Sequence, residues 1–460
     1  MAMNVEQLVK QAIAEITVSG LNNCGSNIFS TMDEAVEAAW SAQKELVKLS
    51  IVEREHLLKS MREEARKNVD LMSRMAYEET GIGRPEDKVK KNILAIDKTP
   101  GTEDLQPVAY TGDDGLTLVE RSPFGVIGAI TPMTNPTETV ICNGIGMIAA
   151  GNSVVFSPHP SAKLCTNKAI EILNHAIIKA GGPANLLTSA AEPSIENANI
   201  MMKHPKIAMI CATGGHGVVK AALSMGKKAI GAGAGNPPAL VDETANIEQA
   251  AIDIINGCSL DNNVLCIAEK EVIVVDSVAD FLIHCMKKHG AYHVTDQKVI
   301  AKLEDMVVDK NGGPNKKFVG KNADYIMKQI GIEIDSSIRV ITAETKADHP
   351  FVMTELLMPV LPIVRVKDVK EGINLAVKVE QGCKHTAIMH SSNVNNLSEC
   401  AKAIQTTIFV KNAPSYAGLG FGGEGHTTYT VAGPTGEGIT SAKCFARERR
   451  CVLYGAFSIR

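Results

Sequence analysis

The feature that most constrains the fold is a regular alternation of short β-prone runs with helical stretches between residues 125 and 234. Each of the first three β-prone runs precedes a stretch with helical periodicity. The runs are "GVIGAIT", "SVVFSP", "IAMICATGG" and "KKAIGAG", and the helical stretches cover 137–150, 166–180 and 217–226. Parallel strands need such crossover connections, so this order predicts a mostly parallel sheet flanked by helices.

A second α/β series follows, so the predicted fold class is α/β throughout. Its strand candidates are "EVIVV" (271–275), "KKFVG" (316–320), "PVLPIVRV" (359–366), "HTAIMH" (385–390) and "TTIFVKN" (406–412). Ahead of both series, residues 31–89 show helical periodicity, and residues 108–120 form two strand-like pieces around a Gly-Asp-Asp-Gly turn. A chain of 460 residues has room for two or three domains.

Composition excludes several classes of protein. A formal net charge of -4 offers no basic surface for nucleic acid, so we expect no nucleic-acid partner. No run approaches the ~20 apolar residues of a membrane span, and the N-terminus lacks a basic start followed by an apolar core, so we expect neither secretion nor membrane association. The 11 cysteines include no C-x-x-C pair. This spacing predicts a reducing, cytoplasmic protein without a disulfide framework or a metal site.

The N-terminus predicts a short amphipathic helix over residues 4–16. Its apolar residues follow the i, i+3, i+4, i+7 spacing of a single stripe, and the Gly/Ser/Asn-rich stretch "TVSGLNNCGSN" after it is typical of a linker. A helix this short is marginal alone and needs a surface for its stripe. That surface is either the chain's own domain or a partner.

Cys266 lies in the apolar run "NNVLCIAEKEVIVV", and by itself is either core filling or a nucleophile. The nearby loop "GAGAGNPP" is typical of a tight corner between domains. No carboxylate occurs between Gly226 and Val241, so this loop offers no general base. Asn135, between two prolines at a strand-to-helix switch, is either a turn residue or an amide donor to an oxyanion.

Three further segments carry alternative interpretations. "CATGGHGVVKAAL" places glycines between a strand and a helix, either as a plain turn or as a phosphate cradle. Glu355 precedes a strand and is either a solvated loop residue or a ligand-binding one. His385 at a strand start is either a core histidine whose ring nitrogens are hydrogen-bonded within the core or a proton-transfer group.

Taken in order, these segments resemble the aldehyde dehydrogenase superfamily, from about Ile28 to Arg460. The blocks that carry the resemblance include "SPFGVIGAITPMTNPTETV", "ATGGHGVVKAA", "GAGAGNPPALVDETA", "NNVLCIAEKEVIVV", "MTELLMPVLPIV" and "GPTGEGITSAKCFARERRCVL". The resemblance is to the CoA-acylating branch, and within it to propionaldehyde dehydrogenases of propanediol-utilising bacterial microcompartments. The N-terminal helix and linker resemble peptides that target such enzymes to a protein shell.

The resemblance implies roles for named residues. Cys266 matches the catalytic cysteine and Asn135 the Thr-Asn-Pro asparagine of the branch. Glu355 matches the glutamate that holds the nicotinamide ribose, and His385 becomes our candidate for assisting the thiol of coenzyme A. The remaining residues implied in NAD binding are Thr131, Pro132, Ser157, Pro158, Thr213, Gly214 and Gly215.

Two departures from hydrolytic members of the superfamily matter chemically. Those members carry a glutamate that activates the deacylating water where this chain reads "GAGAGNPP". General-base assistance is typically worth about 10²–10⁴ in rate, so we expect the acyl-enzyme to resist water. Ser157 stands where they place a lysine for the adenosine ribose, which leaves NAD and NADP both open.

The resemblance therefore implies oxidation of propionaldehyde with NAD and coenzyme A to propionyl-CoA and NADH through a thioester on Cys266. The alternatives are acetaldehyde as main substrate, hydrolysis to the free acid, and a microcompartment component that acts mainly through its N-terminal helix. The implied domains are a targeting segment (1–25), a Rossmann-like cofactor domain (26–107 and 121–236), a catalytic domain (237–428) and an oligomerisation arm (108–120 and 429–460). The arm predicts a homodimer or dimer of dimers. The resemblance further implies a location in the cytoplasm inside a microcompartment, with residues 4–16 bound to a shell protein.

Overall fold

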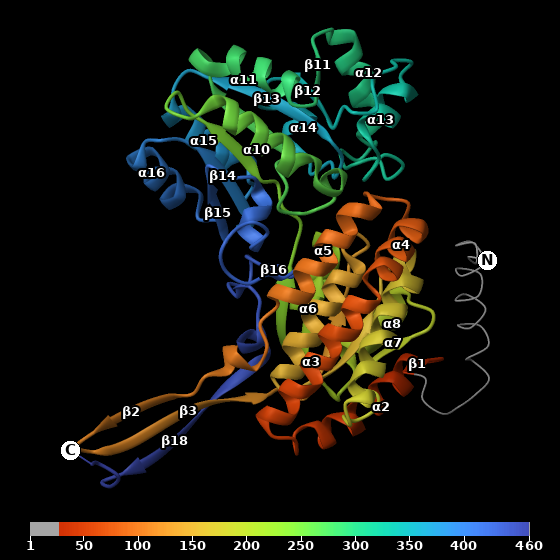
Figure 1. The fold of residues 1–460 in the computed structure, drawn as a ribbon, viewed down its shortest axis with the longest axis vertical. Coiled ribbons are helices and arrows are strands. Elements are labelled where there is room, and N and C mark those ends of the chain that lie inside the picture. Colours follow the sequence, from red (N-terminus) through yellow and green to blue (C-terminus); the bar gives the residue numbers. More distant parts are fainter. Residues whose placement is uncertain (1–26, 460) are drawn as a thin grey trace.

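The computed structural model describes residues 27–459, which form two α/β lobes and a projecting three-stranded arm (Figure 1). The predicted helix over residues 4–16 lies outside the described residues. Both large sheets consist of parallel strands with crossover helices, so the predicted α/β fold class is confirmed.

The first lobe contains a six-stranded sheet in the order β1-β6-β5-β4-β7-β8. Its strands are β1 (Ile28–Phe29), β4 (Val126–Ile130), β5 (Ser153–Ser157), β6 (Leu187–Ala190), β7 (Ile207–Thr213) and β8 (Lys228–Ala232). β4 and β5 are buried at every residue, as expected for strands with helices on both faces. The four β-prone runs that open the predicted alternation correspond to β4, β5, β7 and β8.

Helices cover this sheet, and their starts are encoded locally. The helices are α2 (Met32–Leu46), α3 (Ile51–Lys67), α4 (Val69–Thr80), α5 (Pro85–Lys98), α6 (Pro136–Ala149), α7 (Lys163–Lys179), α8 (Ile195–Lys203) and α9 (His216–Leu223). Thr31 before α2 and Ser50 before α3 each form a capping box with the glutamate three residues later, which satisfies two free backbone amides at each start.

The second lobe contains a seven-stranded sheet in the order β11-β12-β13-β10-β9-β14-β15. Its strands are β9 (Pro238–Val241), β10 (Glu271–Val275), β11 (Ala291–Val294), β12 (Val340–Glu344), β13 (Val360–Val366), β14 (Thr386–His390) and β15 (Ile408–Lys411). Its helices are α10 (Ile247–Ser259), α11 (Asp276–Lys288), α12 (Gln297–Val307), α13 (Ala323–Gln329), α14 (Pro350–Met353), α15 (Val369–Val379) and α16 (Val394–Ile404). Short 3-10 turns and a two-stranded ribbon complete the fold: η2 (Thr102–Leu105), η3 (Pro160–Ala162), η4 (Leu260–Asn263), η5 (Ser415–Leu419), η6 (Ala442–Phe445), β16 (Val431–Ala432) and β17 (Gly438–Ile439).

One predicted strand is wrong. Residues 316–320, "KKFVG", form turns, in which Phe318 N donates to Asn315 O at 2.9 Å and Lys321 N donates to Phe318 O at 3.1 Å. Gly320 has φ +65, which ends any extended run. The apolar pair Phe318 and Val319 is buried by loop packing instead of by a sheet. Strands β1, β6, β9, β11 and β12, each of two to five residues, are absent from the prediction.

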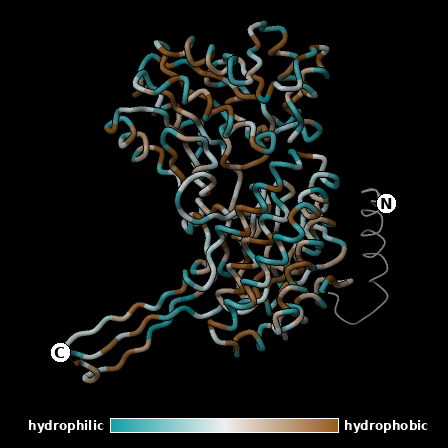
Figure 2. Tube along the Cα trace, viewed as in Figure 1, coloured by the Kyte–Doolittle hydropathy of each residue, from teal (hydrophilic) through white to brown (hydrophobic). Residues whose placement is uncertain are grey.

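The arm joins segments that are far apart in the sequence. β2 (Val108–Gly112) and β3 (Gly115–Pro123) form a hairpin, and β18 (Ala446–Tyr454) pairs antiparallel with β3 along nine residues. The three strands extend well away from the lobes (Figure 2). The arm exposes several large apolar side chains, namely Val108, Tyr110, Val452, Leu453 and Tyr454.

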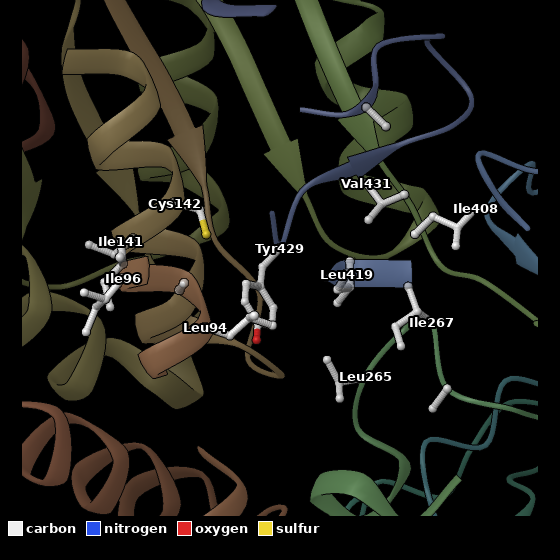
Figure 3. Close-up of a cluster of buried hydrophobic side chains, with 14 of the residues drawn as sticks. Leu94, Ile96, Ile141, Cys142, Leu265, Ile267, Ile408, Leu419, Tyr429 and Val431 are labelled. Atoms are coloured by element: carbon white, nitrogen blue, oxygen red, sulfur yellow. The ribbon is translucent and has the colours of Figure 1, made fainter. Parts of the chain in front are cut away.

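The largest hydrophobic core runs through both lobes and across the seam between them. At the seam, the ring of Tyr429 lies close to Leu94 of α5, and Leu265 and Leu419 face it from the second lobe (Figure 3). Because these side chains come from four separate segments, the seam fixes the two lobes against each other. Across residues 27–459, no helix combines the length and the apolar character needed to span a membrane.

Candidate active site

A cavity of about 220 Å³ opens where the two lobes meet. One wall comes from the ends of strands β4 and β7 in the first lobe, and includes Pro132, Asn135 and the turn Thr213–Gly215. The opposite wall comes from the second lobe and includes Cys266 and Glu355. Ligands of open parallel sheets bind beyond the carboxyl ends of the strands, and the first wall lies at such an edge.

Cys266 follows a segment with unusual backbone geometry. Asp261, Asn262 and Asn263 have φ values of 50, 55 and 67, so three consecutive residues are left-handed. Asp and Asn tolerate this region better than other residues with a β-carbon, which explains the sequence "DNN" at this point. All three side chains are buried, so tertiary contacts hold this sharp turn in place.

The buried ammonium of Lys270 braces the loop that carries Cys266. It donates to Asn263 O at 3.0 Å, to Asn263 Oδ1 at 2.6 Å and to Leu265 O at 3.1 Å. Asn263 in turn donates through Nδ2 to Cys258 O and Glu269 O, at 3.0 and 2.9 Å. The nucleophile candidate therefore sits on a backbone that is fixed from both sides.

The thiol of Cys266 is held in its protonated form. Burial and the carboxylate of Glu355 raise its pKa to about 12, and the ammonium of Lys270 opposes both. A thiol of this kind reacts slowly with solvent reagents, because the thiolate is the reactive species.

Asn135 is buried at the start of α6, with 4% of its surface exposed, and it lines the cavity. Its Oδ1 accepts a hydrogen bond of 2.7 Å from Lys91 Nζ, and its Nδ2 donates to Thr134 Oγ1 at 3.2 Å. An ammonium has no lone pair, so only the amide oxygen can face Lys91. The group that Asn135 can present to the cavity is therefore its NH₂.

The turn Thr213–Gly215 ends β7 and begins α9. Gly214 N donates to Ala232 O at 3.0 Å, and Thr213 Oγ1 lies 2.8 Å from Thr430 Oγ1. A β-carbon added at Gly215 would meet no atom within 4 Å, so the backbone here is open to a ligand. Free amides at a helix start favour an anionic group, so the turn fits the phosphates of a dinucleotide.

The four other residues implied in NAD binding lie around the ends of β4 and β5. Pro132 lines the cavity, whereas Thr131, Ser157 and Pro158 are buried beneath its surface and are not among its lining residues. Thr131 N donates to Ser157 O at 3.2 Å, which joins the two strand ends. Thr131 Oγ1 is buried without a hydrogen-bond partner.

Glu355 lines the cavity and is partly buried. Its Oε1 accepts from Gly235 N at 3.4 Å, a weak contact that leaves most of the carboxylate free for a ligand. Burial raises the pKa of Glu355, and the positive charge of Lys270 counteracts this. The geometry suits a carboxylate that accepts hydrogen bonds from ribose hydroxyls.

His385 is buried and is not among the residues that line the cavity. A β-carbon placed on Gly235 would lie 2.8 Å from His385 Cγ and 2.9 Å from Cys266 O, so this glycine separates the ring from the nucleophile loop. His385 Nδ1 lies 2.9 Å from Thr386 Oγ1, while Nε2 has no partner. Burial and the nearby charge of Lys270 lower its pKa to about 4, so the ring is neutral at pH 7.

A profile of the aldehyde dehydrogenase family matches residues 21–306. The acetylating acetaldehyde dehydrogenase EutE of Escherichia coli is 47% identical over 466 aligned residues, which cover 99% of this chain and 99% of that protein. The chain belongs to the aldehyde dehydrogenase family.

Two solved structures resemble this aldehyde dehydrogenase along nearly its whole length. The propionaldehyde dehydrogenase of Rhodopseudomonas palustris, with bound CoA and an acylated cysteine, has a TM-score of 0.94 and 56% identity, covering 95% of this chain and 100% of its own. A propionaldehyde dehydrogenase from the fucose utilisation microcompartment of Clostridium phytofermentans has a TM-score of 0.93 and 50% identity, covering 94% and 100%. The resemblance to acylating aldehyde dehydrogenases inferred from the motifs is confirmed.

The residues in or behind the aldehyde dehydrogenase site that the sequence prediction does not include are, among others, Lys91, Asp261, Lys270 and Tyr429. Tyr429 lines the cavity, Lys91 binds Asn135 of its wall, Asp261 binds Lys91, and Lys270 binds the loop ahead of Cys266. One local signal existed for Lys270. The three charged residues 269–271 stand between apolar runs, and charges in such a place are buried only when paired.

Proposed function

We propose that the chain is a CoA-acylating aldehyde dehydrogenase that oxidises propionaldehyde with NAD and coenzyme A to propionyl-CoA and NADH. The observation that carries the proposal is Cys266 in a cavity whose lining offers a single carboxylate, Glu355, among the described residues. The R. palustris relative, with CoA bound and a cysteine acylated, supports the same chemistry. EutE of E. coli, named as acetylating, supports acetaldehyde as the second candidate substrate.

In the first half of the reaction, the sulfur of Cys266 adds to the aldehyde carbonyl and its proton leaves to solvent, giving a thiohemiacetal oxyanion. The NH₂ of Asn135 and the backbone amide of Cys266 donate to that oxyanion. NAD, when bound, supplies the acceptor for the hydride that leaves the substrate carbon. Cys266 then carries a thioester.

In the second half, the thiolate of coenzyme A attacks the thioester carbonyl, and the thiolate of Cys266 leaves and takes up a proton. One thioester replaces another, so no net oxidation occurs in this half. From the loop at 231–238, only Gly233 and Ala234 line the cavity, so it supplies only backbone and a methyl group to the wall. Because it has no carboxylate to activate water, transfer to coenzyme A outcompetes hydrolysis.

The residues proposed to hold NAD fit the group. Thr213, Gly214 and Gly215 form the open turn for its phosphates, Glu355 accepts from the nicotinamide ribose, and Pro132 forms the adjoining wall. Thr131, Ser157 and Pro158 support this wall from beneath. We propose that His385 assists the thiol of coenzyme A through its unpartnered Nε2, in the neutral state that its burial favours.

The test is NADH formation by the purified protein with propionaldehyde or acetaldehyde, with and without coenzyme A. We expect one NADH per Cys266 without coenzyme A, then sustained turnover once it is added, with propionaldehyde the better substrate. The two aldehydes differ by one methylene, worth about 1–3 kcal/mol in an apolar pocket. Sustained turnover without coenzyme A would assign the chain to the hydrolytic class.

We also propose three domains for residues 26–460. Residues 26–107 and 121–236 form the cofactor domain, residues 237–428 the catalytic domain, and residues 108–120 and 429–460 the arm. Through this arm the chain forms a homodimer or a dimer of dimers. The two sheets and the exposed apolar side chains of β2 and β18 support this. Sedimentation of the protein with and without residues 446–460 tests the assembly. A monomer in both cases would contradict it.

We further propose that the protein acts in the cytoplasm inside a bacterial microcompartment, with residues 4–16 bound to a shell protein. The C. phytofermentans relative comes from such a compartment. Deleting residues 1–20 should abolish packaging while activity in the purified protein survives. Unchanged packaging of the truncated chain would contradict the targeting role.

A further inference from the structure

A buried cluster of charged side chains lies directly behind Asn135. Lys88 and Lys91 are three residues apart on one face of α5, and 1% and 3% of their side chains are exposed. Both ammonium groups bind the same carboxylate oxygen, Asp261 Oδ2, at 3.1 and 2.7 Å. Asp261 is the first of the three left-handed residues ahead of Cys266. The cluster therefore connects α5 to the nucleophile loop.

Of the two lysines, only Lys91 also binds the side-chain amide of Asn135. Its Nζ contacts three acceptors: Asn135 Oδ1 at 2.7 Å and Glu138 Oε1 at 3.2 Å, both at the start of α6, and Asp261 Oδ2 at 2.7 Å in η4. Burial opposes its charge, but the carboxylates of Asp261 and Glu138 outweigh burial and raise the pKa of Lys91. The ammonium therefore makes a hydrogen bond to Asn135 and ion pairs with the carboxylates of Asp261 and Glu138.

We propose that Lys91 is a positioning residue, which fixes the rotation of the Asn135 amide so that its NH₂ faces the cavity, and ties that amide to the loop of Cys266 through Asp261. The inference rests on the oxyanion role proposed for Asn135. If the amide turned by 180°, its NH₂ would face a buried ammonium and its oxygen would face the oxyanion. Both contacts are repulsive, so Lys91 enforces the productive rotamer.

Lys88 provides a matched control. It lies on the same helix, is equally buried and binds the same oxygen of Asp261, but it has no contact with Asn135 among the described hydrogen bonds. Lys88→Met and Lys91→Met each remove one buried ammonium from Asp261, so the two variants should lose similar thermal stability. They should differ in rate, because only Lys91→Met frees the amide.

The experiment is a double-mutant cycle read as the single-turnover rate of NADH formation at saturating propionaldehyde and NAD, without coenzyme A. We expect Asn135→Ala to slow this step about 10²–10³-fold, as for other oxyanion donors. Lys91→Met should slow it about 10–10²-fold with little change in aldehyde KM, since misorientation removes part of that donor. Lys88→Met should stay within about threefold of the wild type. Lys91→Met added to Asn135→Ala should slow the reaction by less than about threefold more, because the amide is already gone.

Three results would overturn the inference. Equal losses in the Lys88 and Lys91 variants would show a general structural effect, and multiplied losses in the Lys91/Asn135 double variant would show that Lys91 acts elsewhere. An Asn135→Ala variant with normal rate would overturn the oxyanion role itself, which the other two results leave standing. If Lys91→Met does not fold, Lys91→Met with Glu138→Gln removes one charge of each sign from the cluster, and the same cycle is run on that background.

Discussion

The two walls of the cavity are built differently. The wall of Cys266 is rigid: Asp261, Asn263 and Lys270 are buried, and they hydrogen-bond the loop at several points. The facing wall is open, since Gly215 is exposed and a β-carbon on it or on Gly233 would meet nothing within 4 Å. The difference separates two tasks. The rigid wall holds the reacting atoms, and the open wall leaves room for a dinucleotide.

The largest effect is expected on the rigid wall. Cys266→Ser should reduce acyl-CoA formation by at least about 10⁴-fold, in line with the removal of other enzymatic nucleophiles, while the thermal midpoint stays near that of the wild type. The measurement is steady-state acyl-CoA production at saturating substrates. A serine variant with more than a trace of activity would remove Cys266 from the mechanism.

The next effect is expected on the open wall. Gly215→Leu should raise the KM for NAD about tenfold, which corresponds to about 1.4 kcal/mol, because the new side chain enters the space proposed for the phosphates. Gly215 has φ -65 and ψ 165, a conformation that leucine adopts without strain, so folding should be unaffected. Gly217→Leu is the control, since its β-carbon is equally unobstructed but it lies outside the cavity. Equal KM changes in both variants would contradict the assignment of this wall.

The reactivity of Cys266 toward iodoacetamide in the cofactor-free protein should depend steeply on pH. With a pKa of about 12, its alkylation rate should rise about tenfold per pH unit from pH 7 to 10 without a plateau. Glu355→Gln should speed alkylation at every pH, because it removes a carboxylate that raises the thiol pKa. The alkylation rate of Cys266 is measured by peptide mass spectrometry, and the Cys266→Ala variant serves as the control for alkylation of other cysteines. A plateau near pH 8 would mean that the Cys266 thiol is already ionised at that pH, which would contradict a pKa of about 12.

The last effect concerns stability, not activity, behind the rigid wall. Burial raises the pKa of Glu269 to about 7 from 4.5, although its carboxylate accepts from Ser415 N and Oγ at 2.9 and 2.8 Å. The folded state therefore binds the proton more tightly, and the group's contribution to stability is lost as pH rises from about 4.5 through 7, by up to about 3 kcal/mol.

Glu269→Gln keeps both Ser415 contacts possible and does not titrate. Denaturant unfolding of wild type and variant at pH 5 and pH 8 should show the variant gaining relative stability at the higher pH. A difference that does not change with pH would mean that Glu269 titrates alike in both states.

Local patterns in the sequence were enough for most of the first lobe. Val/Ile-rich runs followed by helical periodicity located β4, β5, β7 and β8, and Thr31 and Ser50 encoded helix starts. The pattern failed at 316–320, because two apolar residues buried by a loop have the same appearance as a short strand. Periodicity reports which side chains are buried but does not report which segment buries them.

The same limit applies to the site. The sequence alone, through its ordered motifs, determined the family, the nucleophile candidate Cys266, the glycine turn at 213–215 and the missing carboxylate of the loop at 231–238. Only the tertiary structure decided that Lys91 meets Asn135, 44 positions away, that Lys270 braces the nucleophile loop, and that His385 is buried and neutral behind Gly235. The reason is physical. Hydrogen-bond partners and burial arise when distant segments pack, and no local spacing along the chain records them.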